Sequence, residues 1–126
     1  MECHAVKVAG FGFRDGAGIA SLRAALAAAG GADIGALASV AEKAGAPVLQ
    51  ALAAELGVRV IALPASALNG VATITQSPRL LARFGTGSLA EAAALCAAGP
   101  GAKLLGPRRA SPDGMATAAI AEGSGQ

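Results

Sequence analysis

Strand-like and helix-like segments alternate along the first half of the chain, and this alternation constrains the fold more than any other feature. Runs rich in β-branched or small apolar residues at 5–11, 36–40 and 58–63 are typical of strands. Between them, apolar residues recur at helical spacing from residue 18 to a glycine stop at 30–31, and again from Pro47 to Gly57. Such alternation favours parallel strands covered on both faces. We therefore predict an α/β fold, a three-layer α/β/α sandwich.

The second half of the chain continues this pattern less regularly. Ser77 and Pro78 suit the start of a helix that ends at Gly85, and a further helix is predicted over 88–98. Residues 103–105 and 115–121 are predicted as strands joined by a hairpin-like loop, which makes the mostly parallel sheet mixed. The segment 65–76 shows only a short helical turn. Because 126 residues suit a single core, we predict one domain over residues 1–122 and a flexible tail at 123–126.

Composition excludes several classes of protein. With no Trp or Tyr, three Phe and a formal net charge of +2, the chain lacks the aromatic platforms and the basic field of nucleic-acid binders. The uncharged stretch 60–78 is interrupted by Pro64, Asn69, Gln76 and Pro78, so we expect no membrane span. Two cysteines make no disulfide framework and no signal peptide is visible, so we expect a cytoplasmic protein.

Three segments are expected to reach the carboxyl edge of the sheet, where open α/β sheets bind ligands. The first runs from Gly10 to Gly18 and begins with a glycine turn with a basic tip, Gly10 to Arg14. The second, 41–45, carries Lys43, and the third, 85–91, leads into a helix N-terminus. A basic loop at 106–114 adds guanidinium groups, which suit carboxylates. These features indicate a site for an anionic small molecule, with Gly10, Gly12, Arg14, Lys43, Thr86, Gly87, Ser88, Glu91, Arg108, Arg109, Ser111 and Thr117 as ligand-binding candidates.

Each of these features also has a structural explanation. Gly10 and Gly12 suit a tight strand-to-helix turn with positive φ angles. They make a poor dinucleotide fingerprint because Asp15 occupies the third glycine position, so nucleotide binding is a less favoured alternative. Ser88 and Glu91 have the spacing of a capping box. The basic pair at 108–109 is as well explained by solvation as by ligand binding.

The sequence offers no convincing catalytic constellation. His4 is the single histidine and lies beside Cys3, without the further ligands that a zinc site needs. No Ser-His-Asp or Cys-His arrangement can be assembled around it. We therefore predict no metal and no cofactor and assign no catalytic residue.

Several segments together resemble the cobalamin-biosynthesis family that comprises CobE and the C-terminal domain of CbiG. They span nearly the whole chain: GFGFRDG at 10–16, Glu42-Lys43 before the Pro-started helix, GTGSLAEAAAL at 85–95, and LLGPRRAS at 104–111 followed by Ala116-Thr117. The sequence departs from the family at Asp15, where a basic residue is often found, and at Met115, where Asn is frequent.

The resemblance implies a role in corrin-ring construction. The ligand would be a precorrin, a modified tetrapyrrole whose acetate and propionate groups would pair with the basic residues at 14, 43, 108 and 109. Thr86 and Ser88 would donate to ring substituents or to a lactone oxygen. A stand-alone chain of this size is similar to the members of the aerobic route, which implies a carrier or accessory protein, with other enzymes of the pathway as further partners.

An enzymatic alternative stays open beside the carrier. Longer members of the family open a lactone on cobalt-precorrin-5A, so the resemblance also admits a lactone hydrolase-like activity. Such a reaction would need Lys43, Glu42 or Glu91 beside the scissile carbonyl. We favour binding, because the sequence offers cations and hydrogen-bond donors but no persuasive pair of nucleophile and base.

Overall fold

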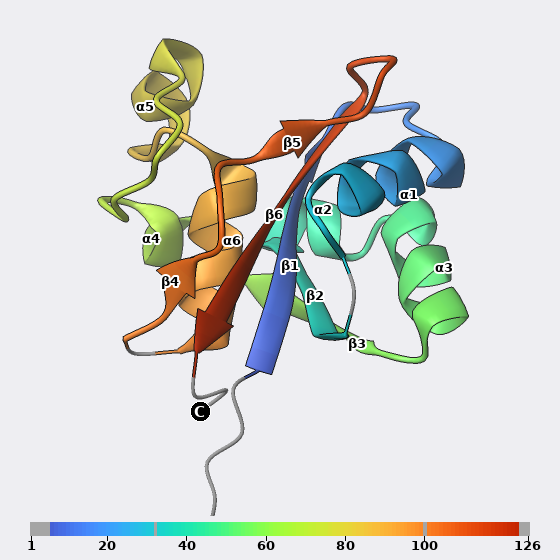
Figure 1. Cartoon of the computed structure of the whole chain (residues 1–126). Helices are drawn as coiled ribbons and strands as arrows, with labels where there is room; N and C mark the ends of the chain where they lie inside the picture. Colours follow the sequence, from blue (N-terminus) through green and yellow to red (C-terminus); the bar gives the residue numbers. More distant parts are fainter. Residues whose placement is uncertain (1–5, 32, 100, 124–126) are drawn as a thin grey trace, which may run out of the picture.

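A six-stranded sheet forms the centre of the protein (Figure 1). The computed structural model describes residues 6–31, 33–99 and 101–123. The sheet has the order β3-β2-β1-β6-β4, and β5 also pairs with β6. The strands are β1 (Val6–Phe13), β2 (Ile34–Val40), β3 (Arg59–Leu63), β4 (Lys103–Leu104), β5 (Arg109–Ala110) and β6 (Ala116–Gly123).

Strand β6 is the one strand of the described sheet that runs against the others. β1, β2 and β3 pair in parallel, whereas β1, β4 and β5 each pair with β6 in antiparallel fashion. The prediction of a mostly parallel, mixed sheet is therefore confirmed. The described part of β6 extends to Gly123, which pairs with Val6, one residue beyond the predicted end of the domain.

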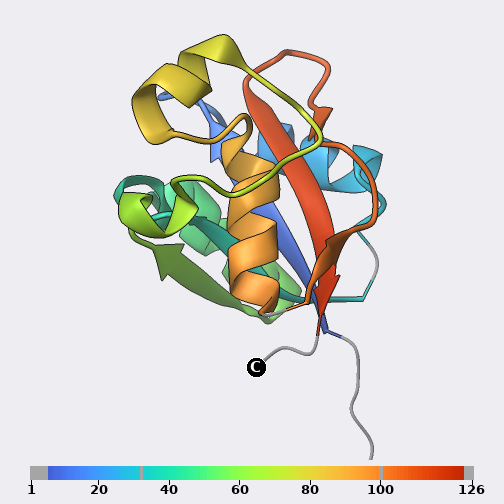
Figure 2. The ribbon, with the colours of Figure 1, turned by 90° about the vertical axis from the view of Figure 1, so that its left-hand side faces the viewer.

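Helices cover both faces of the sheet, as the alternating pattern predicts. α1 and α3 lie on one face, and α4 and α6 lie on the other (Figures 1 and 2). The helices are α1 (Ile19–Ala28), α2 (Ala41–Ala44), α3 (Pro47–Leu56), α4 (Ala65–Leu68), α5 (Pro78–Phe84) and α6 (Leu89–Ala98). No helix in the described ranges is long and apolar enough to cross a membrane.

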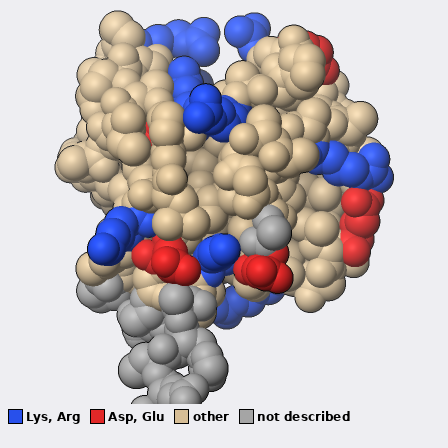
Figure 3. Space-filling view, in the orientation of Figure 1, with Lys and Arg blue, Asp and Glu red and all other residues tan. Residues whose placement is uncertain are grey.

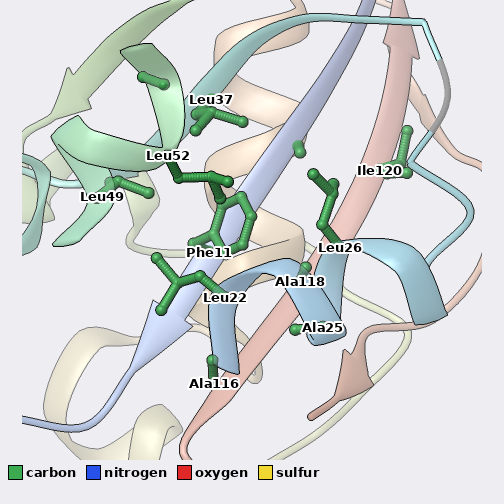
Figure 4. Close-up of a cluster of buried hydrophobic side chains, with 12 residues drawn as sticks. Phe11, Leu22, Ala25, Leu26, Leu37, Leu49, Leu52, Ala116, Ala118 and Ile120 are labelled. Carbon is green, nitrogen blue, oxygen red and sulfur yellow. The ribbon is translucent and has the colours of Figure 1, made fainter. Parts of the chain in front are cut away.

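The larger side chains of the core lie between the sheet and the pair α1 and α3. Phe11 projects from β1 into a cluster with Leu22 of α1, Leu37 of β2, and Leu49 and Leu52 of α3 (Figure 4). All five are fully buried. Burial of each side chain of this kind contributes about 1.5–3 kcal/mol, so this face supplies most of the hydrophobic stabilisation.

The opposite face of the sheet is packed with small residues, which lets α6 approach the strands closely. Gly10 of β1 lies directly beneath this helix. A Cβ atom on Gly10 would lie 2.0 Å from the carbonyl oxygen of Ala90 and 2.6 Å from the backbone nitrogen of Ala94. The backbone of α6 therefore rests on β1 at a position where only glycine fits.

The predicted glycine turn at Gly10 to Arg14 is wrong, because β1 continues through it. The antiparallel ladder with β6 extends from Val6 to Phe13, which pairs with Ala116. Gly10 and Gly12 lie in the strand, and the positive φ angle of this region belongs to Gly16, at 88°. The pairing partner, β6, is distant in sequence, so no local pattern identifies it.

Candidate functional site

A wide cleft opens at the carboxyl edge of the sheet. It has a volume of about 850 Å³ and lies between the end of β1, α2, α5 and the segments that flank β5. A neighbouring cavity of about 540 Å³ shares Arg14 and Lys43 with it. The edge of the sheet that was predicted to bind a ligand thus carries the larger of these two cavities. The cleft is lined by Gly12, Phe13, Arg14, Asp15, Glu42, Lys43, Arg79, Leu80, Arg83, Leu89, Arg108, Ala110, Gly114, Met115, Ala116 and Thr117.

Basic side chains dominate the polar part of this lining. Five Lys or Arg residues line the cleft, against two acidic residues. Lys and Arg side chains gather around a notch in the upper edge of the molecule, between the lobe of α5 and the tip of the β5–β6 loop (Figures 1 and 3). Since opposite charges attract across a cleft with low-dielectric walls, this edge favours anionic ligands.

The basic side chains come from three parts of the fold. Arg14 directly follows β1, where its backbone N–H donates to the carbonyl of Met115 at 2.9 Å, and Lys43 lies on α2. Arg108 directly precedes β5. Arg79 and Arg83 lie one turn apart on α5. Three of the four predicted basic residues, Arg14, Lys43 and Arg108, are therefore brought together, and α5 adds two that sequence reasoning missed.

Two of the basic residues are paired with acidic residues at the rim. The ammonium of Lys43 lies 3.1 Å from a carboxylate oxygen of Asp15 and 5.1 Å from the centroid of the Phe13 ring. The guanidinium of Arg83 lies 3.2 Å from Glu42. Among the described residues, no carboxylate forms an ion pair with Arg14, Arg79 or Arg108. Three guanidinium groups therefore remain available to a ligand.

Apolar side chains form the remaining wall of the cleft. Phe13, Leu80, Leu89 and Met115 line it together with the basic residues. A ligand with a broad apolar surface and charged groups at its periphery matches this combination. Gly12 and Thr117 face each other here, and the Thr117 hydroxyl donates to the Gly12 carbonyl at 3.2 Å. Both predicted residues therefore lie at the cleft.

Glu91 is buried and its carboxylate is fully engaged within the protein. Its oxygens accept hydrogen bonds from the Thr75 backbone N–H at 2.9 Å, the Thr75 hydroxyl at 2.6 Å and the Arg108 backbone N–H at 2.8 Å. Burial raises the pKa of Glu91, but the hydrogen bonds from Thr75, Arg108 and the Ile74 backbone together hold it below the ordinary value. Glu91 thus joins α6 to two segments beside the cleft and does not line the cleft.

Thr86, Gly87 and Ser88 are also buried and do not line the cleft. The Thr86 hydroxyl donates to the Val71 carbonyl at 3.0 Å, and the Ser88 hydroxyl accepts from the Glu91 backbone N–H at 3.2 Å. A Cβ atom on Gly87 would lie 2.3 Å from the Thr75 carbonyl oxygen. These residues support the segment that leads to α5. The capping-box interpretation holds for Ser88, whereas the Glu91 carboxylate binds elsewhere.

Arg109 and Ser111 belong to the predicted site but lie outside the cleft. Successive residues of a strand face opposite sides, so Arg108 and Ala110 line the cleft while Arg109 does not. The Ser111 hydroxyl is buried, donates to Asp113 at 2.5 Å and accepts from the Ala116 backbone N–H. Asp113 also accepts from Ser21 of α1, and these bonds lower its pKa to about 2. This cluster fixes the β5–β6 loop.

The described residues contain no group of ligands that would hold a metal ion. Cys3 and His4, the pair considered for a metal site, lie outside the described residues. The start at Ser77-Pro78 and the stop at Gly85 predict a helix here but assign no ligand-binding role to Arg79 and Arg83. The sequence does carry a signal for them. Arg79 and Arg83 are four residues apart in a helix that starts at Ser77-Pro78, so both lie on one face of that helix.

The fold and the cleft together define a class: an α/β domain whose mixed sheet carries a wide basic cleft at its carboxyl edge. The family described as "Cobalamin synthesis G C-terminus" matches residues 7–121. The chain belongs to this family and is a protein of the cobalamin biosynthesis pathway, which confirms the resemblance of its sequence segments.

The solved structures similar to this chain include two cobalamin-pathway proteins. The crystal structure of CobE, described as a protein from the cobalamin (vitamin B12) biosynthetic pathway, is 34% identical, with a TM-score of 0.79 over 94% of this chain and 90% of that chain. The cobalamin biosynthesis protein chiG from Agrobacterium tumefaciens str. C58 is 35% identical, with a TM-score of 0.67 over 92% of this chain and 97% of that chain. No curated protein matches the chain.

Proposed function

We propose that this domain binds a precorrin as a carrier or accessory protein of the aerobic route of corrin-ring construction. The observation that carries the proposal is the cleft itself, in which five basic residues surround an apolar wall. The two similar structures are both named as cobalamin-pathway proteins, so a tetrapyrrole intermediate is the ligand class to which this chemistry is best matched. Other enzymes of the pathway would be its partners, in the cytoplasm.

The chemistry of a precorrin agrees with the lining of the cleft. Its acetate and propionate groups match guanidinium groups, which bind carboxylates through paired, charge-assisted hydrogen bonds. Its ring system matches the apolar surface of Leu80, Leu89 and Met115. A volume of about 850 Å³ lies within the usual range of about 300–1,000 Å³ for small-molecule sites.

Binding is favoured over lactone hydrolysis because the candidate catalytic groups form no pair of nucleophile and base. Glu91 is buried with both oxygens hydrogen-bonded, so it does not reach a ligand in the cleft. Glu42 and Lys43 line the cleft, but their polar contacts among the described residues are ion pairs with Arg83 and Asp15, and neither contacts a nucleophilic side chain. A carrier needs only cationic side chains and hydrogen-bond donors that bind the ligand, and five basic residues line the cleft. Nucleotide binding loses its basis, because the two glycines of the supposed phosphate loop lie in β1.

Incubation of the purified protein with a precorrin tests this proposal. Binding predicts a retained chromophore with an altered absorbance spectrum, one ligand per chain and an unchanged ligand mass. A changed ligand mass at catalytic ratios of protein would show an enzyme instead. The variants Arg14→Ala and Arg108→Ala should weaken binding, whereas Arg23→Ala, which removes an exposed arginine paired with Glu55 on the α1–α3 side, should not. Equal binding by all three variants would contradict the assignment of the cleft.

A further inference from the structure

We infer that α5 is a second basic wall of the cleft, so that the site selects ligands whose carboxylates lie on opposite edges of the molecule. The inference rests on the proposed tetrapyrrole function and adds to it a rule of selection. Arg79 and Arg83 form this wall, and Arg14 and Arg108 form the wall at the sheet edge. Lys43 of α2 lines the cleft next to Glu42, the ion-pair partner of Arg83.

The two walls belong to separate parts of the fold. α5 stands apart from the β5–β6 loop in two views that differ by 90°, and the basic notch opens between these two features (Figures 1, 2 and 3). Arg79 and Arg83 are four residues apart and therefore share a face of α5, and both line the same cavity as Arg14 and Arg108. A ligand with carboxylates along one edge meets one wall, whereas a ligand with carboxylates all round meets both.

The position of α5 is fixed at both of its ends. The backbone N–H of Gly70 donates to the Gly85 carbonyl at 2.9 Å, and that of Ser77 donates to the Gly87 carbonyl at 2.9 Å. The buried Glu91 carboxylate holds Thr75, two residues before Ser77. Because these bonds set the separation of the walls before a ligand arrives, the spacing of the ligand's carboxylates decides whether both walls are used.

The acidic partners of the basic residues at the rim can be replaced by the carboxylates of a ligand. Arg83 pairs with Glu42 and Lys43 pairs with Asp15, and the two acidic partners are more than half exposed. Exposed ion pairs of this kind contribute little to stability. A ligand carboxylate therefore replaces Glu42 or Asp15 at low cost.

Two porphyrins that differ in the number and placement of their carboxylates are suitable probes. Mesoporphyrin IX carries both of its propionates on one edge, whereas coproporphyrin I carries a propionate on every pyrrole ring. Titration followed by absorbance and fluorescence gives a Kd for each. We expect the wild-type protein to prefer coproporphyrin I by about tenfold, equivalent to about 1.4 kcal/mol.

The double variant Arg79→Gln/Arg83→Gln should abolish this preference by weakening coproporphyrin I alone, and Arg79→Lys/Arg83→Lys should retain it. The variant Arg59→Gln/Lys103→Gln is the matched control, since it removes the same charge from the first residues of β3 and β4, at the opposite edge of the sheet. An unchanged preference in the Gln variant, or an equal loss for both porphyrins, would overturn the inference alone. Failure of the wild-type protein to bind either porphyrin would contradict the proposed function and this inference with it.

Discussion

The carboxylate of Glu91 accepts a hydrogen bond from the backbone N–H of Arg108 at 2.8 Å, which ties the N-terminal turn of α6 to the loop that carries a basic residue into the cleft. The same carboxylate accepts two hydrogen bonds from Thr75, in the segment that leads to α5. One buried side chain thus holds the segments that carry the two walls. Its role is to position the site, and it does not itself meet the ligand.

Replacing this carboxylate with an amide is expected to destabilise the fold. In Glu91→Gln, an amide NH₂ would face donors of Thr75 and Arg108, leaving at least one buried donor without an acceptor. Loss of hydrogen bonds to a buried charged group costs about 1.5–3 kcal/mol, so we expect a decrease of about 2 kcal/mol in the free energy of unfolding. Urea denaturation measures it. Glu55→Gln, which affects an exposed ion pair, should change stability far less, and an equal effect of the two would contradict this role.

The stability of the protein should decrease as the pH is lowered in the acid range, and protonation of Glu91 should contribute to this decrease. Its folded pKa lies below the ordinary value of 4.5. Its contribution is therefore complete above about pH 4.5 and is lost as the pH falls through the folded pKa, where the native state takes up the proton. Thermal unfolding between pH 7 and pH 3 should show a shallower pH dependence in Glu91→Gln than in the wild-type protein. Parallel curves would refute this linkage.

Protonation of Asp113 should also decrease the stability of the protein, but at lower pH than protonation of Glu91. Its pKa is about 2 in the folded protein, against 3.8 ordinarily, because Ser111, Ser21 and the Met115 backbone donate to its carboxylate. The resulting stabilisation is complete above about pH 4 and declines as the pH approaches 2. Asp113→Asn should lose this component, visible as a smaller drop in Tm between pH 4 and pH 2. A drop in Tm over this range equal to that of the wild-type protein would contradict the contribution of Asp113.

A methyl group at Gly10 is expected to disrupt the contact between β1 and α6. The added Cβ would lie 2.0 Å from the Ala90 carbonyl oxygen, a backbone atom that cannot move without shifting the helix. Overpacking of a core costs about 1–3 kcal/mol or more, and we expect Gly10→Ala to lie at or above the upper end. Gly18→Ala is the control, because Gly18 has extended backbone and nothing within 4 Å of its added Cβ. Similar urea midpoints for the two variants would contradict this packing.

The sequence predicts the layers of the fold well, because the longer helices and most strands carry their own periodic signal, whereas the four-residue helix α2 was not predicted. The helices starting at Pro47, Pro78 and Leu89 begin and end at the residues that their caps indicate. The end of β1 could not be predicted in this way. Its extension to Phe13 depends on pairing with Ala116, and Gly10 within it is explained by the close approach of α6 and not by a turn.

The candidate site was predicted in part, for a related reason. Arg14, Lys43 and Arg108 follow or precede strands at the expected edge, so topology alone brings them together. Whether a polar residue near that edge faces the cleft or the interior depends on contacts between segments distant in sequence. Glu91 and Thr86 turn inward because the 71–76 segment packs over them, and nothing in that segment's irregular sequence indicates this.

Arg108 and Arg109 provide the sharpest test of the cleft, because they are adjacent and identical in chemistry. Arg108 lines the cleft and Arg109, in β5, does not. Arg108→Gln and Arg109→Gln change the net charge equally, so any long-range electrostatic effect on an anionic ligand is nearly matched between them. We expect Arg108→Gln to weaken coproporphyrin I binding about fivefold, equivalent to about 1 kcal/mol, and Arg109→Gln to leave the Kd within about twofold. Equal losses would mean that general positive charge attracts the ligand, whereas a larger loss at Arg109 would place the site on the other side of β5.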